Sequence, residues 1–267
     1  MFTGPAFPAK VRLTSRSDRT GSVINKAPRH IVHNLAYGAC AARRKLAAAA
    51  LLVCAALAAG SAGPARAADP EPPVVIAALG DSLTQGYGLL PEDGLVPQLG
   101  RWLEAHGQSV RMINAGVSGD TTAGGAARID WTLTPDVQAL IVALGANDLL
   151  RGIDPATSRA NLDRILATAQ DRGLPVLLIG VAAPDNYGPD YKAAFDAIYP
   201  DLAARYDTLL IPDLLAPLRK WRTEDPVALA AVMQDDGLHP NRDGVALVVD
   251  AIGPEVARLV ARAQAGP

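Results

Sequence analysis

Two segments that lie far apart in the sequence carry residue types that together could perform acyl transfer. Ser82 follows the apolar run of residues 74–79, and the segment 235–240, with the sequence DDGLHP, supplies Asp236 and His239. A serine hydroxyl can attack a carbonyl carbon when an imidazole takes its proton and a carboxylate orients that imidazole. The two segments therefore form a candidate acyl-transfer site if the fold brings them together.

The histidine of such a site can be chosen by elimination. From residue 68 onward the sequence contains only His106 and His239. His106 ends a helical pattern directly before Gly107, where an imidazole complements the negative end of the helix dipole. His239 lies in a loop between glycine and proline residues, and loops carry a large share of catalytic residues. We therefore predict that the general base is His239.

Four serines follow residue 68, and only one of them suits a nucleophile. Ser109 precedes a predicted strand and Ser158 lies in the first turn of a predicted helix, so both are expected to be solvent-exposed or capping residues. Ser118 nearly completes a G-x-S-x-G motif, but Asp120 stands at its last position, which argues against an α/β-hydrolase fold. Ser82 lies just past a predicted strand and is the best candidate, with a helix N-cap as its alternative role.

Apolar runs alternate with amphipathic segments along the chain. The runs lack polar alternation, as is typical of parallel strands buried on both faces. One helical pattern opens at Asp154 and closes at Gly173, and another covers residues 245–259, where the Gly-Pro pair at 253–254 is expected to kink or interrupt it. This alternation predicts a three-layer α/β/α sandwich, in which ligands bind at the carboxyl edge of the sheet. The predicted strands are residues 74–79, 110–114, 139–144, 176–179 and 208–211.

The N-terminal region has the pattern of an export signal. Residues 46–59 form an apolar, alanine-rich run that basic residues precede and the sequence Ala-Arg-Ala at 65–67 follows. This order is typical of a secretory signal peptide, and the run is shorter than the about 20 residues of a membrane-spanning helix. We predict a signal peptide over residues 43–67, one domain over residues 68–267, and a periplasmic or secreted protein. Residues 1–42 are an uncertain extension, either a wrongly assigned translation start or a genuine one.

Charge and cysteine content narrow the partners and the chemistry. Residues 68–267 hold 15 basic and 26 acidic residues, a formal charge of −11. An acidic domain is a poor match for nucleic acid or for an anionic lipid surface. Cys40 and Cys54 both precede residue 68, so neither a disulfide nor a cysteine nucleophile is expected in the domain. Two distant histidines without cysteine make a zinc site improbable, and no metal or cofactor is expected.

Four sequence blocks, in this order, resemble the GDSL or SGNH hydrolases: GDS at 80–82, SGDT at 118–121, GAND at 145–148 and DGLHP at 236–240. Further blocks, NYG at 186–188, AIYP at 197–200 and QDDGLHPNRD at 234–243, are similar to those of the secreted multifunctional esterases that act as acyl-CoA thioesterase, lysophospholipase and arylesterase. The resemblance implies a flavodoxin-like sheet of five parallel strands in the order 2-1-3-4-5.

The resemblance also implies a role for each site residue. Ser82 would be the nucleophile and His239 the base, and the D-x-x-H pattern selects Asp236 over the competing Asp235 as the orienting carboxylate. The oxyanion would be stabilised by the backbone N–H groups of Ser82 and Gly119 and by the side-chain amide of Asn147, whose alternative role is an ordinary turn residue. Asp81 and Asp148 are expected to support loops rather than react.

The implied substrate is a small-molecule acyl ester, thioester or lysolipid. A carbohydrate O-acetylesterase is the alternative within the same fold, and a non-catalytic binding protein is the alternative outside enzymes. Residues 184–194 follow the fourth strand and are rich in turn formers, so Tyr187 and Tyr191 are predicted to shape an acyl groove. A plain surface connector is the other interpretation of that segment. A monomer is expected by default.

Overall fold

The strands form a parallel sheet with the predicted order. The computed structural model describes residues 72–266, and in it the strands run in the order β2-β1-β3-β4-β5. Every neighbouring pair is parallel, so the predicted topology is confirmed. The strands are β1 (Val74–Gly80), β2 (Val110–Gly116), β3 (Ala139–Ala143), β4 (Val176–Ile179) and β5 (Leu209–Ile211).

Strand ends differ slightly from the predicted ones. β1 and β2 continue to Gly80 and Gly116, which pair with each other at the carboxyl edge. Leu144 and Thr208 lie just outside β3 and β5. An apolar run marks the buried part of a strand, whereas the hydrogen-bonded ladder can continue through glycine. The extension matters because it carries the ladder up to the residue before Asp81.

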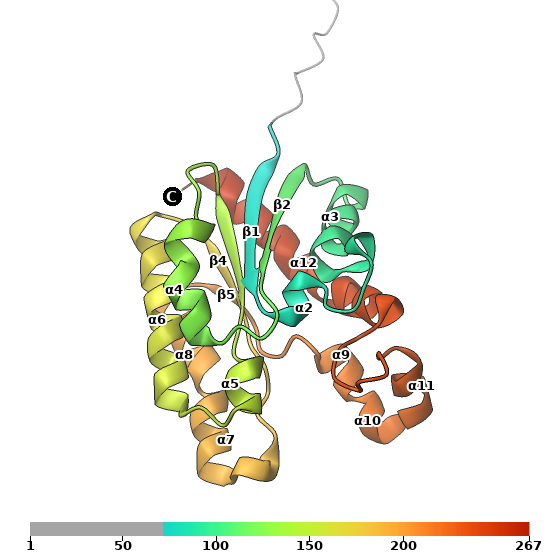
Figure 1. Cartoon of the computed structure of the whole chain (residues 1–267). Helices are drawn as coiled ribbons and strands as arrows, with labels where there is room; N and C mark the ends of the chain where they lie inside the picture. Colours follow the sequence, from blue (N-terminus) through green and yellow to red (C-terminus); the bar gives the residue numbers. More distant parts are fainter. Residues whose placement is uncertain (1–71, 267) are drawn as a thin grey trace, which may run out of the picture. The chain divides into compact units, whose positions relative to one another are not determined.

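Helices cover both faces of the sheet, which confirms the predicted three-layer sandwich (Figure 1). Alternate residues of β1 point to opposite faces. Ala77 and Leu79 pack with α4, α6 and α8, whereas Ile76 and Ala78 pack with α3 and α12. These helices are α3 (Leu95–Ala105), α4 (Thr122–Thr132), α6 (Pro155–Asp171), α8 (Ile198–Tyr206) and α12 (Arg242–Ala265).

Short helices gather at the carboxyl edge of the sheet, at the bottom of Figure 1. They belong to the connections that leave the strands, where ligands bind in open α/β sheets. They are α2 (Ser82–Gln85), α5 (Ala146–Leu150), η2 (Asp185–Tyr187), α7 (Pro189–Asp196), α9 (Ala216–Arg219), α10 (Trp221–Glu224) and α11 (Pro226–Ala231), and a further turn, η1 (Pro91–Asp93), precedes α3.

Helix α6 begins where the sequence predicts. The side chain of Asp154 caps it by accepting from the N–H of Ala156 at 2.8 Å, and Pro155 occupies the first helical position. Gly173, with φ of +66°, follows the last turn. The cap and the glycine fix both ends of this helix.

Of the two outcomes predicted at the Gly-Pro pair 253–254, a kink or an interruption, the interruption is wrong and the kink stays a prediction. Helix α12 runs through Pro254, although proline removes one backbone hydrogen bond from a helix interior. Ile252 and Val256 are buried on either side of it, and Gly253 lies against Trp102, where a Cβ atom would come within 2.6 Å of the indole ring. Packing on both sides of the proline therefore outweighs the missing bond.

The predicted extension at residues 1–42 and signal peptide at residues 43–67 lie outside the described residues, and both stay predictions. Within residues 72–266, no helix combines the length and the apolar character needed to cross a membrane.

Candidate active site

Ser82 begins α2 at the point where β1 ends. Asp81 caps this short helix, because its side chain accepts from the N–H of Leu83 at 3.0 Å. Ser82 is therefore the first residue of the helix and not its N-cap. A Cβ atom on Gly80 would lie 1.9 Å from Thr84 Oγ1, so glycine is needed for the chain to turn this tightly. The turn presents the Ser82 hydroxyl at the carboxyl edge of the sheet.

The structure brings Ser82, His239 and Asp236 together. The Oγ atom of Ser82 lies 2.8 Å from His239 Nε2, and His239 Nδ1 lies 2.6 Å from Asp236 Oδ2. The carboxylate can only accept, so Nδ1 carries the proton and Nε2 is left to accept one from the serine. This is the arrangement of a nucleophile, its base and the group that orients the base.

The loop that carries His239 is tied to its surroundings at both ends. Gln234 N–H donates to the carbonyl oxygen of His239 at 2.8 Å, and Asn241 caps α12 by accepting from the N–H groups of Asp243 and Gly244. The side chain of Gln234 also donates to the carbonyl oxygen of Tyr87 at 2.8 Å. The loop is thus linked to the segment that follows Ser82.

Asp236, and not Asp235, faces the histidine. Its Oδ1 atom accepts from the N–H groups of Leu238 and His239, both at 2.9 Å. Hydrogen bonds from the backbone and from the side chain of His239 lower the pKa of Asp236 to about 2, so it is ionised at neutral pH. Asp235 is exposed, and within residues 72–266 its side chain makes no hydrogen bond.

Gly119 and Asn147 lie on the same cleft as Ser82. Gly119 has φ of +81°, a conformation that favours glycine. In the described part of the chain, neither its N–H nor that of Ser82 has a hydrogen-bond acceptor. The amide of Asn147 donates to the carbonyl oxygen of Asp120 at 2.9 Å, which uses one of its two hydrogens. The other hydrogen remains for a ligand.

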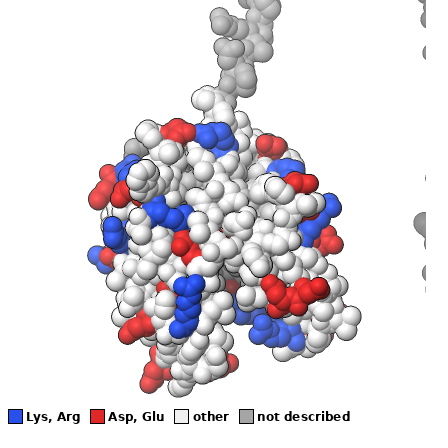
Figure 2. Space-filling view, in the orientation of Figure 1, with Lys and Arg blue, Asp and Glu red and all other residues white. Residues whose placement is uncertain are grey.

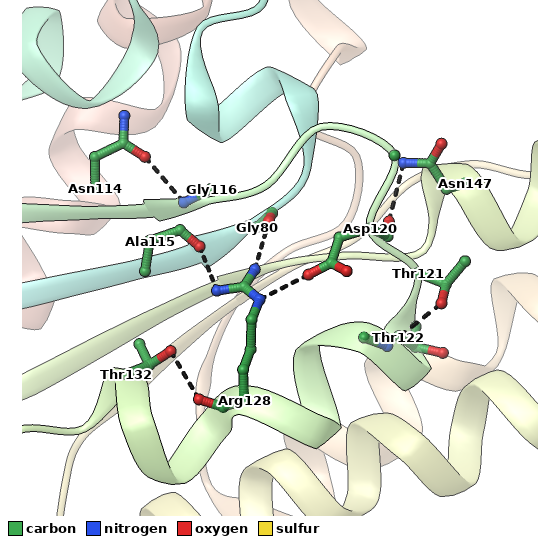
Figure 3. A network of polar contacts seen from close by, with 12 residues as sticks. Gly80, Asn114, Ala115, Gly116, Asp120, Thr121, Thr122, Arg128, Thr132 and Asn147 are labelled. Atoms are coloured by element: carbon green, nitrogen blue, oxygen red, sulfur yellow. Dashed lines mark hydrogen bonds and ion pairs between the residues drawn. The ribbon is translucent and has the colours of Figure 1, made fainter.

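Arg128 is a residue of this region that the sequence analysis missed. Its guanidinium group donates to the carbonyl oxygens of Gly80 and Ala115 and to the carboxylate of Asp120 (Figure 3). A basic residue two helical turns beyond Asp120, on the helix that follows it, was the available signal. Arg151 also donates to the carbonyl oxygen of Gly119, at 2.7 Å.

The two further aspartates support loops by different contacts. Asp148 is fully buried and accepts from the backbone and hydroxyl of Thr122, at 2.9 and 2.5 Å, and from the hydroxyl of Ser158 at 2.9 Å. Ser158 is therefore a buried partner of Asp148, and the prediction that it is solvent-exposed or capping is wrong. Burial raises the pKa of Asp81 to about 6.

Ser118, Ser109 and His106 make no hydrogen bond to His239 among the described residues. Ser118 is exposed, and its hydroxyl donates to the side chain of Gln85 at 3.0 Å. Ser109 is exposed ahead of β2. His106 follows the last residue of α3 and stacks on Trp102, with ring centroids 3.7 Å apart. Among the residues that the structure describes, no cluster of His, Cys, Asp or Glu could hold a metal ion.

A cleft of about 590 Å³ opens at Ser82 and His239. Figure 2 shows the surface hollowed at its lower edge, between the lobe that carries α5 and α7 and the lobe formed by α9 to α11. Most of its lining is apolar, and the apolar residues belong to the hydrophobic clusters on both faces of the sheet. They include Leu83, Leu144, Leu149, Val181, Leu214, Leu218, Leu229 and Met233.

Only one of the two predicted groove tyrosines reaches this cleft. Tyr187 lines it, whereas Tyr191 lies behind, with ring centroids 4.8 Å apart and its hydroxyl donating to the carbonyl oxygen of Ile153 at 2.8 Å. The segment also has more structure than a loop, because α7 begins at Pro189 and Tyr191 packs against the core. The packing of Tyr191 could not be predicted from the sequence, because tyrosine is common on surfaces as well as in cores.

Comparisons with known proteins identify relatives of this chain. Residues 78–247 match the model of the GDSL-like Lipase/Acylhydrolase family. The esterase TesA of Pseudomonas aeruginosa is 39% identical over 166 residues, which cover 62% of this chain and 79% of that protein. The Escherichia coli K12 protein named thioesterase 1/protease 1/lysophospholipase L1 is 34% identical over 198 residues, or 73% and 87% of the two chains. The crystal structure of AlinE4, an SGNH-hydrolase family esterase, superposes with a TM-score of 0.56 at 44% identity and covers 70% of this chain and 96% of that one.

Proposed function

The chain belongs to the GDSL-like lipase/acylhydrolase family, whose members hydrolyse esters, and on that premise we propose a serine esterase that cleaves carboxylic esters and thioesters of acyl chains. One observation carries the proposal. Ser82 Oγ, His239 and Asp236 form a continuous chain of contacts of 2.8 and 2.6 Å at an apolar cleft. Arylesterase, thioesterase and lysophospholipase activities are the forms this chemistry would take.

The first half of the reaction forms an acyl-enzyme. Ser82 Oγ attacks the carbonyl carbon of the substrate while His239 Nε2 takes the hydroxyl proton. Asp236 stabilises the imidazolium that results and keeps Nδ1 protonated. The tetrahedral intermediate then collapses, the bond to the leaving alcohol or thiol breaks, and His239 returns the proton to that group.

The negative charge on the intermediate needs donors that are already in place. The N–H groups of Ser82 and Gly119 and the second hydrogen of the Asn147 amide fill this role in the proposal. Each comes from a different connection at the carboxyl edge: β1 to α2, β2 to α4, and β3 to α5. The three donors therefore depend on how these connections are held relative to one another.

The second half repeats the chemistry with water. His239 takes a proton from a water molecule, whose oxygen attacks the acyl carbon, and the proton then passes to Ser82 Oγ as the acyl bond breaks. A free carboxylic acid leaves, and the enzyme returns to its starting state. Besides the substrate and water, the proposed steps use side chains and backbone groups of this chain.

The cleft favours an acyl chain over a sugar. Leucine is the most frequent residue of the lining, and its aromatic rings are those of Tyr87, Tyr187 and His239. Burial of each CH₂ group in such a cleft contributes about 0.8 kcal/mol. A carbohydrate ester would instead require polar partners for its hydroxyls, and the polar side chains of the lining, such as Asn186, Asp213 and Arg219, are outnumbered by apolar ones. We assign the apolar walls to the acyl group.

We also propose that the protein is exported and acts in the periplasm or outside the cell.

Covalent labelling tests the function. A fluorophosphonate probe should label the wild-type protein at Ser82, and Ser82→Ala should lose both the label and turnover of 4-nitrophenyl butyrate, by about 10⁴-fold or more. Ser118→Ala is the matched control, because this serine lines the same cleft but its hydroxyl donates to the side chain of Gln85. Loss of activity in Ser118→Ala with retention in Ser82→Ala would refute the assignment.

A further inference from the structure

Arg128 joins the ends of two strands to the loop that follows one of them. Its Nη2 donates to the carbonyl oxygen of Gly80 at 2.9 Å, its Nη1 to that of Ala115 at 2.7 Å, and its Nε to Asp120 Oδ2 at 2.7 Å (Figure 3). The pair with Asp120 is largely shielded, with 23% and 15% of the two side chains exposed. A single planar group thus contacts three segments at once.

The contacts fall beside two of the proposed donors. Gly80 lies two residues before Ser82, and Asp120 directly follows Gly119. Gly80 also accepts from the N–H of Val117 at 3.1 Å, which ties the end of β1 to the start of the Gly119 loop. The guanidinium group therefore bridges the two connections that carry the free N–H groups.

The absence of a side chain at Gly124 leaves room for the Asp120 carboxylate that accepts from Arg128. A Cβ atom on Gly124 would lie 1.9 Å from Asp120 Oδ1, so the carboxylate occupies the space that a side chain at that position would fill. Its backbone carbonyl oxygen accepts from Asn147 at 2.9 Å. Asp120 consequently links Arg128 to the third donor as well.

We propose that Arg128 is a positioning residue that sets the spacing between the N–H groups of Ser82 and Gly119, and through Asp120 orients the amide of Asn147. The inference rests on the proposed function. Arg128 does not line the cleft, so it acts without touching the substrate. Lysine could keep the charge beside Asp120, but it lacks the planar fork that reaches two carbonyl oxygens as well.

The test compares Arg128→Gln and Arg128→Lys with wild type on a short 4-nitrophenyl ester. We expect kcat to fall by about 100-fold or more in both variants, the loss typical of one displaced oxyanion donor, while KM stays unchanged. Asn147→Ala sets the scale for the loss of one donor. Arg172→Gln is the matched control, since Arg172 also donates to a backbone carbonyl oxygen, that of Leu133, and to Asp130, away from the cleft.

Inhibitor affinity separates positioning from general destabilisation. A trifluoromethyl ketone forms a tetrahedral oxyanion on Ser82, and its Ki should weaken in the Arg128 variants by the same factor as kcat/KM. The Ki of the product acid, which forms no such oxyanion, should not change. If Arg128→Gln does not fold, Asp120→Ala removes the carboxylate that accepts from Arg128 Nε and is measured in its place.

Three results would overturn the inference: wild-type kcat in Arg128→Lys, a loss that appears only in KM, or equal losses of Tm and activity in Arg128→Gln and Arg172→Gln. Wild type and Ser82→Ala are measured in the same assay as controls on the proposed function. An inactive wild type or an active Ser82→Ala refutes the proposed function itself, whereas normal behaviour of those two with unaffected Arg128 variants refutes only the role of Arg128.

Discussion

Asp236 and Asp235 are chemically identical neighbours that the fold treats differently. Both hydrogen bonds to Asp236 Oδ1 come from the backbone of the next three residues, so the side chain turns back onto its own loop and meets the imidazole of His239. Asp235 is exposed and makes none of these contacts. The spacing D-x-x-H places the carboxylate within this turn, whereas D-x-x-x-H adds one residue and loses the backbone contacts.

Substitution of the two aspartates should therefore give very different results. In Asp236→Asn the amide replaces an acceptor facing Nδ1 with a donor, which favours the tautomer protonated at Nε2. That tautomer cannot take the proton of Ser82, so we expect kcat to fall by about 10⁴-fold with little change in KM. Asp235→Asn, the matched control, should keep near wild-type kinetics. The reverse ranking would move the orienting role to Asp235.

Residue-level chemistry was only partly predictable from sequence. Ser82 and His239 could be chosen because few serines and histidines follow residue 68, so elimination was effective. Arg128 could not be chosen this way, because arginine is common and its role depends on two carbonyl oxygens and one carboxylate from different segments. Its spacing from Asp120 suggests one of these contacts, but the two carbonyl partners depend on the tertiary fold.

At the scale of elements, strands were easier to predict than the connections at the carboxyl edge. Buried parallel strands are short apolar runs with few alternatives, and β4 matches its predicted range of 176–179. The segment 184–194 has turn formers and polar residues that also suit a surface loop, yet α7 begins within it at Pro189. At Pro254 the error was the opposite one: the sequence predicted a possible break, but α12 continues because packing along the helix overrides a local helix breaker.

The segment with Tyr187 should control preference among acyl chains. Tyr187 lines the cleft and rests on Tyr191, which is anchored to Ile153 through its hydroxyl. Tyr187→Ala should flatten the dependence of kcat/KM on chain length from C2 to C10 esters, because each CH₂ buried there contributes up to about 0.8 kcal/mol. Tyr191→Ala should produce a weaker form of the same change by releasing Tyr187.

The matched control is Tyr191→Phe, which keeps the ring under Tyr187 and removes only the hydroxyl. Its chain-length profile should stay close to that of wild type. The acetyl ester should be hydrolysed at nearly the same rate by all variants, since it barely extends into the cleft. A uniform loss at every chain length would make this segment structural and remove it from substrate binding.

At the scale of the whole molecule, charge divides the chain into two regions. Residues 1–67 hold 10 basic residues and one acidic residue, whereas residues 68–267 carry a formal charge of −11. Acidic and basic side chains are interspersed on the face shown in Figure 2. A basic N-terminal region ahead of an apolar run suits an export signal, and an acidic domain suits a protein that stays in solution after release.

Export should therefore produce a protein that begins at Ala68. Cleavage requires small residues on the N-terminal side of the cut, and Ala65 and Ala67 supply them. N-terminal sequencing and intact mass of the periplasmic and medium fractions of an expressing cell give the position directly. Ala67→Leu, which replaces the small residue next to the cut, should leave an uncleaved precursor with unchanged sequence in the domain. An exported wild-type protein that retains residues 46–59 would instead mean that this apolar run anchors the enzyme, and activity would then sediment with the membrane fraction.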